Sequence, residues 1–181
     1  MILPIYTYGS SVLRKKSEPI TKDFPELKTL VENMFETMYH AKGVGLAAPQ
    51  IGQDIRVLVI DFKELEDEDL RTFKVAMVNP EMLEMSEETE TKEEGCLSIP
   101  GINENVVRSK SLKIRYLDVN FDEHTEEFTG FRARAIQHEY DHLEGALFTD
   151  KVAPLRRQFI KTKLNSIIRG KATCDYKTKS A

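Results

Sequence analysis

The sequence lacks any long apolar run. Its most hydrophobic pieces, such as VLVI at 57–60, have the length of a strand and fall far short of the roughly 20 residues that cross a bilayer as a helix. The opening segment, MILPIYTYGSSVLRKK, places its basic residues after the apolar ones, which reverses the order found in a secretory signal. We therefore expect a cytoplasmic protein without a membrane partner.

Cysteine is also scarce. Cys96 and Cys174 are the 2 cysteines among 181 residues, too few for a disulfide framework, so we expect each to be a free thiol or a metal ligand. The chain contains no internal repeat and no interdomain linker, and its length is usual for one domain. With 40% hydrophobic and 31% charged residues, the composition is that of an ordinary globular protein and not of a disordered chain.

The net charge of −4 conceals an asymmetry along the chain. From Lys151 onward there are nine lysines and arginines against one acid, Asp175, so this segment carries +8 and the remainder carries −12. A basic segment on an acidic body predicts contact with a polyanion, although a merely solvated helix would have the same composition.

Periodicity predicts a single α+β domain in which strands precede most of the helices. In the first predicted helix, Asp23 and Glu26 resemble a capping box, with Pro25 in the first turn. The segment 43–52 is too rich in glycine and alanine for a regular core element, 63–71 reads as an exposed loop, and 171–181 reads as a disordered tail. Helices are predicted at 23–41, 131–143 and 155–169, and strands at 55–61, 75–79, 82–92, 106–119 and 126–130.

The strongest chemical signal is the segment HEYDH at 138–142. Histidines at i and i+4 of a helix project from one face, so His138 and His142 are within reach of one metal ion. Glu139 is then placed to take a proton from a metal-bound water. The alternative is a helix that carries two surface histidines.

A catalytic metal site needs a third protein ligand and an open position. The extended protease pattern HExxHxxGxxH ends here on Phe148, which cannot bind a metal, and no glutamate follows Glu144. His40 at a helix end and His124 in a predicted turn are more typical of surface residues. Cys96, in the segment EGCLSIP, remains as the candidate, and a thiolate with two imidazoles suits zinc or ferrous iron.

Three segments, GVGLAAPQ at 43–50, EGCLSIP at 94–100 and QHEYDHLEG at 137–145, resemble in order and spacing the three signature motifs of bacterial peptide deformylases. The resemblance extends over nearly the whole chain. It implies a catalytic domain over 1–170, with small, mostly antiparallel sheets around a central metal-binding helix and with a helix at the C-terminal end. It also implies a metal-dependent hydrolase that removes the formyl group from the N-terminal methionine of nascent polypeptides and releases formate.

The resemblance further implies a role for individual residues. Glu139 matches the general acid/base, Gln50 and the backbone N–H of Leu97 match the donors that stabilise the oxyanion, and Gly45 matches a contact to the substrate backbone. The family metal is usually Fe²⁺, with Zn²⁺, Ni²⁺ or Co²⁺ as possible occupants. The positions that match the metal ligands are Cys96, His138 and His142.

Helical spacing predicts the pocket for the methionine side chain. Phe131, Arg134 and Ala135 precede His138 on or near the same helix face, and Val44 comes from the glycine-rich segment. Because a charge cannot lie unpaired in a dry pocket, we expect the Arg134 stem to line the rim while its guanidinium reaches water, or else the whole side chain to point away.

Asn103 stands where related enzymes often carry an arginine near the substrate. The resemblance also suggests that the basic C-terminal helix docks on the ribosome near the nascent-chain exit; a DNA partner is not expected. A metallopeptidase and a non-enzymatic metal-binding module are the competing interpretations, and the missing downstream ligand and the missing fourth ligand argue against them respectively.

Overall fold

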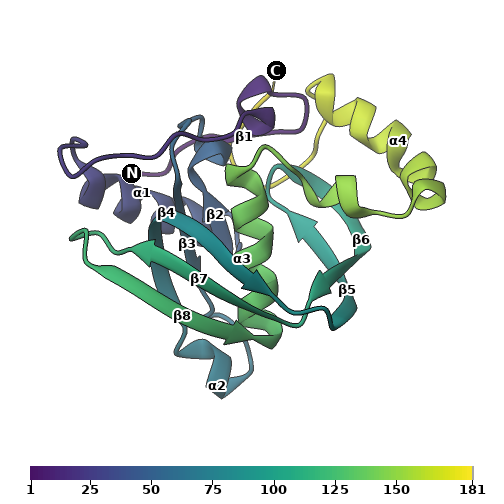
Figure 1. The fold of residues 1–181 in the computed structure, drawn as a ribbon. Helices are drawn as coiled ribbons and strands as arrows, with labels where there is room; N and C mark the ends of the chain where they lie inside the picture. Colours follow the sequence, from purple (N-terminus) through teal and green to yellow (C-terminus); the bar gives the residue numbers. More distant parts are fainter. Residues whose placement is uncertain (181) are drawn as a thin grey trace.

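The computed structural model describes residues 1–180, which form three small sheets around one central helix (Figure 1). The largest sheet has five antiparallel strands in the order β2-β3-β4-β7-β8. Its strands are β2 (Gly45–Ala47), β3 (Val57–Asp61), β4 (Lys74–Met85), β7 (Ser111–Leu117) and β8 (Glu123–Thr129). A second antiparallel pair joins β5 (Thr89–Cys96) to β6 (Ile99–Ser109), and a short parallel pair joins β1 (Ile5–Tyr6) to β9 (Thr178–Lys179).

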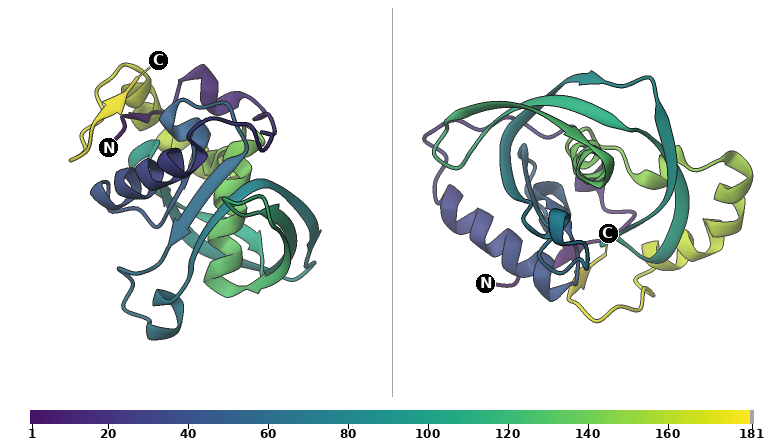
Figure 2. Two further views of the ribbon diagram at one scale, coloured as in Figure 1. Left: turned by 90° about the vertical axis from the view of Figure 1, so that its left-hand side faces the viewer. Right: turned by 90° about the horizontal axis from the view of Figure 1, so that it is seen from below.

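Four α-helices accompany the sheets: α1 (Leu27–His40), α2 (Glu68–Arg71), α3 (Gly130–Leu143) and α4 (Pro154–Ile168). Short 3-10 helices lie at Ser11–Arg14, Ala48–Ile51 and Phe148–Lys151. Helix α3 runs through the middle of the molecule, and the view along its axis shows strands curving around it (Figure 2). The predicted α+β architecture, with antiparallel sheets around the HEYDH helix and a C-terminal helix, is confirmed.

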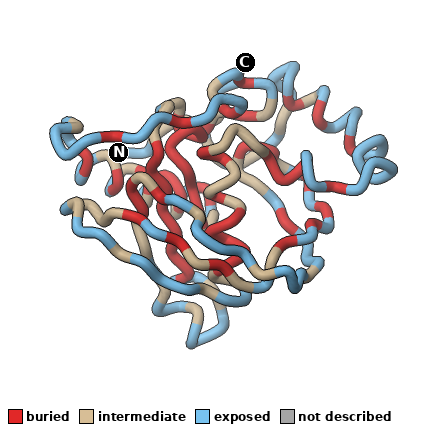
Figure 3. The backbone as a smooth tube through the Cα atoms, viewed as in Figure 1, coloured by how far each residue is buried: buried red, intermediate tan, exposed pale blue. Residues whose placement is uncertain are grey.

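Strand β3 explains why the core has two layers. All of its residues are buried, because Val57 and Val59 face α1 while Leu58 and Ile60 face α3. A strand covered on both faces reads as a continuous apolar run, as here. Burial is concentrated on β2, β3 and α3, whereas β8 and α4 are largely exposed (Figure 3). None of the helices within residues 1–180 is long and apolar enough to cross a membrane.

The structure corrects several predicted boundaries. Helix α1 begins at Leu27, not at 23, because Glu26 adopts a left-handed conformation (φ 56°) and no capping box forms with Asp23. The segment 43–52 is not irregular, because Gly45–Ala47 is a buried strand that pairs with β3. The predicted loop at 63–71 contains the short helix α2, which Asp67 caps.

The strand predictions divide the chain at the wrong places. Strand β4 continues through Pro80 with a shift in register, so the predicted strands at 75–79 and 82–92 do not occur as such. The single long strand predicted at 106–119 is two strands, β6 and β7, which separate at Lys110. The Lys110 N–H donates a hydrogen bond to the carbonyl of Glu88, and the Lys110 carbonyl accepts one from the N–H of Gly130. The chain therefore leaves one sheet and enters the other at this residue.

The segment after α4 also differs from the prediction of a disordered tail at 171–181. Residues 171–180 follow a defined path that ends in β9, and residue 181 lies outside the described residues. Ile5 and Thr7 donate backbone hydrogen bonds of 2.9 and 3.0 Å to the carbonyls of Lys177 and Lys179. A two-residue strand has too little pattern to be read from sequence when its partner lies at the other end of the chain.

Candidate active site

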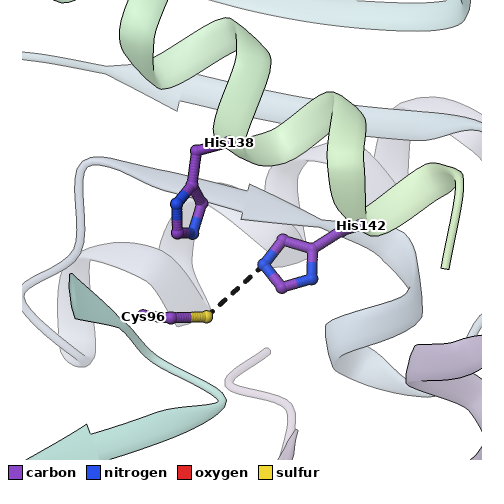
Figure 4. Close-up of side chains that lie close together, drawn as sticks. All are labelled: Cys96, His138 and His142. Atoms are coloured by element: carbon purple, nitrogen blue, oxygen red, sulfur yellow. Dashed lines mark hydrogen bonds between the residues drawn. The ribbon is translucent and has the colours of Figure 1, made fainter. Parts of the chain in front are cut away.

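Cys96, His138 and His142 lie close together, with the Cys96 side chain facing the two histidines (Figure 4). Cys96 is the last residue of β5, and the two histidines lie one helical turn apart on α3. One potential ligand atom from each residue lies within 4.8 Å of the others, and Cys96 Sγ is 3.4 Å from His142 Nε2. The predicted triad is therefore assembled from two elements that are distant in sequence.

Glu94 orients the first of these histidines. Its Oε1 lies 2.8 Å from His138 Nδ1, which leaves Nε2 of that ring for the triad. Burial alone would raise the pKa of Glu94, but hydrogen bonds from His138 and Arg108 outweigh it and hold the pKa at about 2. A carboxylate behind a histidine ligand fixes its tautomer and strengthens it as a donor. Sequence reasoning missed this residue, although it opens the EGCLSIP segment.

Two arginines surround the Glu94 carboxylate. Arg108 Nε and Nη2 donate hydrogen bonds of 2.6 and 2.9 Å to it, and Arg108 Nη1 reaches Asp141 at 2.8 Å. Arg134 donates to Glu94 at 2.6 Å and to the backbone carbonyls of Glu90 and Val106. A cluster of buried and paired charges thus lies immediately behind the triad.

Both expectations for Arg134 were wrong. Its guanidinium neither reaches water at a pocket rim nor points away into solvent, because the residue is only 5% exposed and its charge is neutralised by Glu94. The argument that a charge cannot lie unpaired in a dry site was sound. The prediction was wrong because nothing in the local sequence pattern indicated that the Glu94 carboxylate would be buried beside Arg134 and pair with it.

Glu139 lies beside the triad in a dry environment. The residue is 5% exposed, its Oε2 has no hydrogen-bond partner among residues 1–180, and burial raises its pKa to about 7. Gly45 packs directly against it: a Cβ on Gly45 would come within 2.3 Å of Glu139 Oε1. The glycine therefore provides the space that the carboxylate occupies.

Gln50 is held in one orientation. Its Oε1 accepts a 2.9 Å hydrogen bond from the Ala47 N–H, which turns its NH₂ group toward Cys96 Sγ at 3.5 Å and Ser98 Oγ at 3.2 Å. Leu97 and Ser98 form the turn between β5 and β6, where Cys96 pairs with Ile99. The amide group of Gln50 and the backbone of Leu97 thus both lie next to the triad.

A cavity of about 580 Å³ opens onto this centre. Every sequence-predicted site residue except the buried His142 is in its lining, and so is Asn103. Four further lining residues come from the C-terminal segment that sequence reasoning treated as disordered. The predicted residues in the lining are Val44, Gly45, Gln50, Cys96, Leu97, Phe131, Arg134, Ala135, His138 and Glu139; the unexpected ones are Thr173, Cys174, Asp175 and Tyr176.

The donor set fits a divalent transition metal. One thiol and two imidazoles supply three ligands on the inner side, and the cavity leaves the remaining side open, as in catalytic sites. Burial holds the pKa of His142 well below its usual value, so its ring is neutral, as ligation requires. The carboxylate of Glu139 beside the open side can then serve a bound water or substrate and need not be a fourth ligand.

The comparisons with known proteins agree with this geometry. Residues 2–158 match the family model for polypeptide deformylase. The chain is 50% identical to a peptide deformylase of Flavobacterium psychrophilum, over 99% of this chain and 97% of the relative, and 48% identical to one of Christiangramia forsetii, over 98% and 95%. The crystal structure of a Legionella pneumophila peptide deformylase superposes with a TM-score of 0.82 at 39% identity, covering 93% of this chain and 96% of that one.

A structure of the Plasmodium falciparum peptide deformylase gives a TM-score of 0.84 at 37% identity, covering 92% of this chain and 95% of that one. Members of this family depend on a divalent metal ion, and Cys96, His138 and His142 form a cluster of the kind that could hold one. The chain belongs to the polypeptide deformylase family, the hydrolases that remove the N-formyl group from formylmethionyl nascent peptides.

Proposed function

We propose that the chain is a cytoplasmic, iron(II)-dependent deformylase in which Glu139 carries the proton and Cys96, His138 and His142 hold the metal. The observation that supports this most directly is the buried Glu139 carboxylate beside the triad, of which one oxygen has no hydrogen-bond partner within residues 1–180. Bound there, a divalent ion would act as a Lewis acid and lower the pKa of water. A thiolate with two imidazoles suits ferrous iron as well as zinc.

In this mechanism Glu139 takes a proton from the attacking water and later delivers it to the nitrogen of the leaving amine. Its desolvation favours both steps, because a carboxyl with a pKa near 7 can accept and release a proton at neutral pH. Formate and a free N-terminus are the products. Gly45 gives the carboxylate its space and presents its own backbone to the peptide chain of the substrate.

Gln50 and the N–H of Leu97 stabilise the negative charge that develops on the formyl oxygen. The hydrogen bond from Ala47 fixes the Gln50 amide before substrate arrives, so little reorganisation is needed when the charge forms. Donors of this kind act in the transition state more than on the planar formamide, and this difference is what accelerates the reaction.

The methionine side chain enters the part of the cavity lined by Val44, Phe131 and Ala135. Phe131 packs on Phe62 with ring centroids 5.0 Å apart, which gives the pocket a firm apolar wall. Ala135 is small and leaves room for a long unbranched thioether. Arg134 also lines the cavity, with its guanidinium paired with Glu94.

The proposal is tested by anaerobic purification with metal analysis, followed by incubation with formyl-Met-Ala-Ser and with the unformylated peptide. We expect iron at one equivalent, formate and free amine in equal amounts, and no cleavage of either internal peptide bond. Glu139→Gln should keep its metal and lose turnover by about 10²–10⁴-fold. Internal cleavage would indicate a peptidase, and loss of metal in the variant would refute the assignment of Glu139 as a base.

A further inference from the structure

The segment 171–180, which we call the C-terminal strap, runs from the end of α4 to β1 (Figure 1). It is attached at three points. Ala172 packs on the core cluster beneath α4, Tyr176 packs on the cluster that contains Leu97, and Thr178 and Lys179 pair with β1. Between these attachments, residues 173–176 line the cavity that holds the triad. The strap is therefore part of the active-site wall.

Tyr176 links the strap to the backbone of Leu97 in the active site. Its hydroxyl donates a 2.7 Å hydrogen bond to the carbonyl oxygen of Leu97. Burial is the largest of the effects that raise the pKa of Tyr176, so the phenol remains a proton donor throughout the neutral range. Leu97 follows the metal ligand Cys96, and its own N–H is the oxyanion donor of the proposed function.

The turn that Leu97 forms with Ser98 is held from outside its own hairpin. Tyr8 N–H donates a 2.8 Å hydrogen bond to the Ser98 carbonyl, and Gln50 donates to the Ser98 hydroxyl. These two bonds fix Ser98 but leave the Leu97 carbonyl to Tyr176. The Leu97 N–H and carbonyl belong to two successive peptide planes that meet at the Leu97 Cα, so an anchor on the carbonyl restricts the Leu97 torsions that orient its N–H.

We propose that Tyr176 is a positioning residue of the deformylation site, which holds the Leu97 N–H toward the formyl oxygen through its hydrogen bond to the Leu97 carbonyl. The inference rests on the proposed function, in which that N–H stabilises the oxyanion. Complete loss of an oxyanion donor costs about 10²–10³-fold in kcat. A donor that is present but no longer held in place costs less, and we expect roughly a 5- to 30-fold loss.

The test is Tyr176→Phe, which keeps the ring and its packing and removes only the hydroxyl. Because the lost interaction acts in the transition state, kcat and kcat/KM should fall together while KM stays within about two-fold. In the zinc form, the carbonyl ¹³C resonance of Leu97 and the amide resonance of Ser98 should shift. The melting temperature should change little, since the strap keeps its other attachments.

Tyr6→Phe is the matched control. Tyr6 lies on β1, the partner of β9, and its ring covers Gly52 and lies under the Lys179 ammonium. The control should leave kcat and the Leu97 resonance at their wild-type values. Tyr176→Ala, which also removes the ring, should lower the melting temperature as well as kcat.

A Tyr176→Phe enzyme with wild-type kcat and an unshifted Leu97 carbonyl would overturn the inference and leave the proposed function intact. A loss confined to Tyr176→Ala would likewise overturn it, because it would reduce Tyr176 to a packing residue. If the wild-type protein released no formate from formyl-Met-Ala-Ser, the proposed function would fail first, and the inference with it.

Discussion

At the residue scale, Gly45 and Glu139 share one small volume, and this makes the glycine a sensitive probe of the carboxylate. A methyl group at Gly45 would overlap Glu139 Oε1, Cδ and Cγ at 2.3, 2.8 and 2.9 Å. Gly45→Ala should therefore displace the carboxylate and lower kcat by at least about 10²-fold, while the triad still takes up one metal ion. Activity and metal content measured on the same preparation check this.

Gly101→Ala is the control for that substitution, because Gly101 also lines the cavity but a Cβ there meets nothing within 4 Å. Because Gly101 has a positive φ of 75°, the substitution should lower the stability of the protein somewhat, but it should leave kcat unchanged. Near-normal kcat in Gly45→Ala would mean that Glu139 tolerates displacement, and its assignment as the proton carrier would have to be abandoned.

Phe131 is the residue on which we expect the selection of methionine to depend. Phe131→Ala removes an apolar wall of the cavity, so the preference for formyl-Met over formyl-Ala peptides should fall by about 1–3 kcal/mol in kcat/KM. Phe73→Ala is matched to it, because Phe73 packs on the same Phe62 ring at 5.2 Å without lining the cavity. An unchanged ratio for Phe131→Ala, or an equal loss in both variants, would contradict the pocket assignment.

At the scale of the element, strand β5 connects stability to metal binding through Glu94. Glu94→Gln would leave Arg108 and Arg134 buried without their shared anion, a loss of about 3–5 kcal/mol in the free energy of unfolding. It would also weaken the hold on His138, so metal affinity should fall about 10–100-fold. Denaturant unfolding of the metal-free protein and competitive metal titration measure the two effects separately.

Glu93→Gln supplies the comparison for Glu94, since Glu93 is the exposed neighbour on the same strand. It should change the free energy of unfolding by no more than about 0.5 kcal/mol. If Glu94→Gln kept full metal affinity, the orientation of His138 would have to come from another contact.

Some of the basic side chains of helix α4 are paired with other parts of the fold, and others are exposed to solvent. Arg156 pairs with Glu104, and Arg157 bonds to Thr149 and Asp150, so both contribute to packing. Lys161 and Lys163 are exposed and are free for a polyanion. They are therefore the appropriate positions at which to test the ribosome contact expected for the C-terminal helix.

Reversing both charges, with Lys161→Glu and Lys163→Glu, should weaken ribosome binding and reduce its salt dependence, because phosphate contacts release counterions. The control is the double variant Lys22→Glu with Lys28→Glu, which changes the net charge by the same amount at two exposed positions in or near α1. It should leave ribosome binding unchanged. Co-sedimentation at several salt concentrations gives the comparison. Equal affinity of both double variants for ribosomes would rule out α4 as the contact.

At the scale of the whole molecule, the sequence predicts features that depend on neighbouring residues, such as helices. It does not predict contacts between residues that are distant in the sequence. The HEYDH helix was predicted at 131–143 and found at Gly130–Leu143, because its periodicity and the following Gly145 act within a few turns. Cys96 was identified as the third ligand by eliminating the other candidates and then through the family motifs, since no local pattern links β5 to α3. The burial of Glu94 and of the Arg134 head group escaped prediction because their charges are paired with partners from distant parts of the chain.

The pairing of β1 with β9 has a further consequence for how the molecule is made. A chain leaves the ribosome with its N-terminus first, so the two antiparallel sheets and α3 can form while later residues are still being added. The wall of the cavity cannot be completed until residues 171–180 have emerged and paired with Ile5 and Tyr6. An enzyme that acts on newly made chains thus acquires its own finished site only after residues 171–180 have joined β1, later than the parts of the fold that precede them in the sequence.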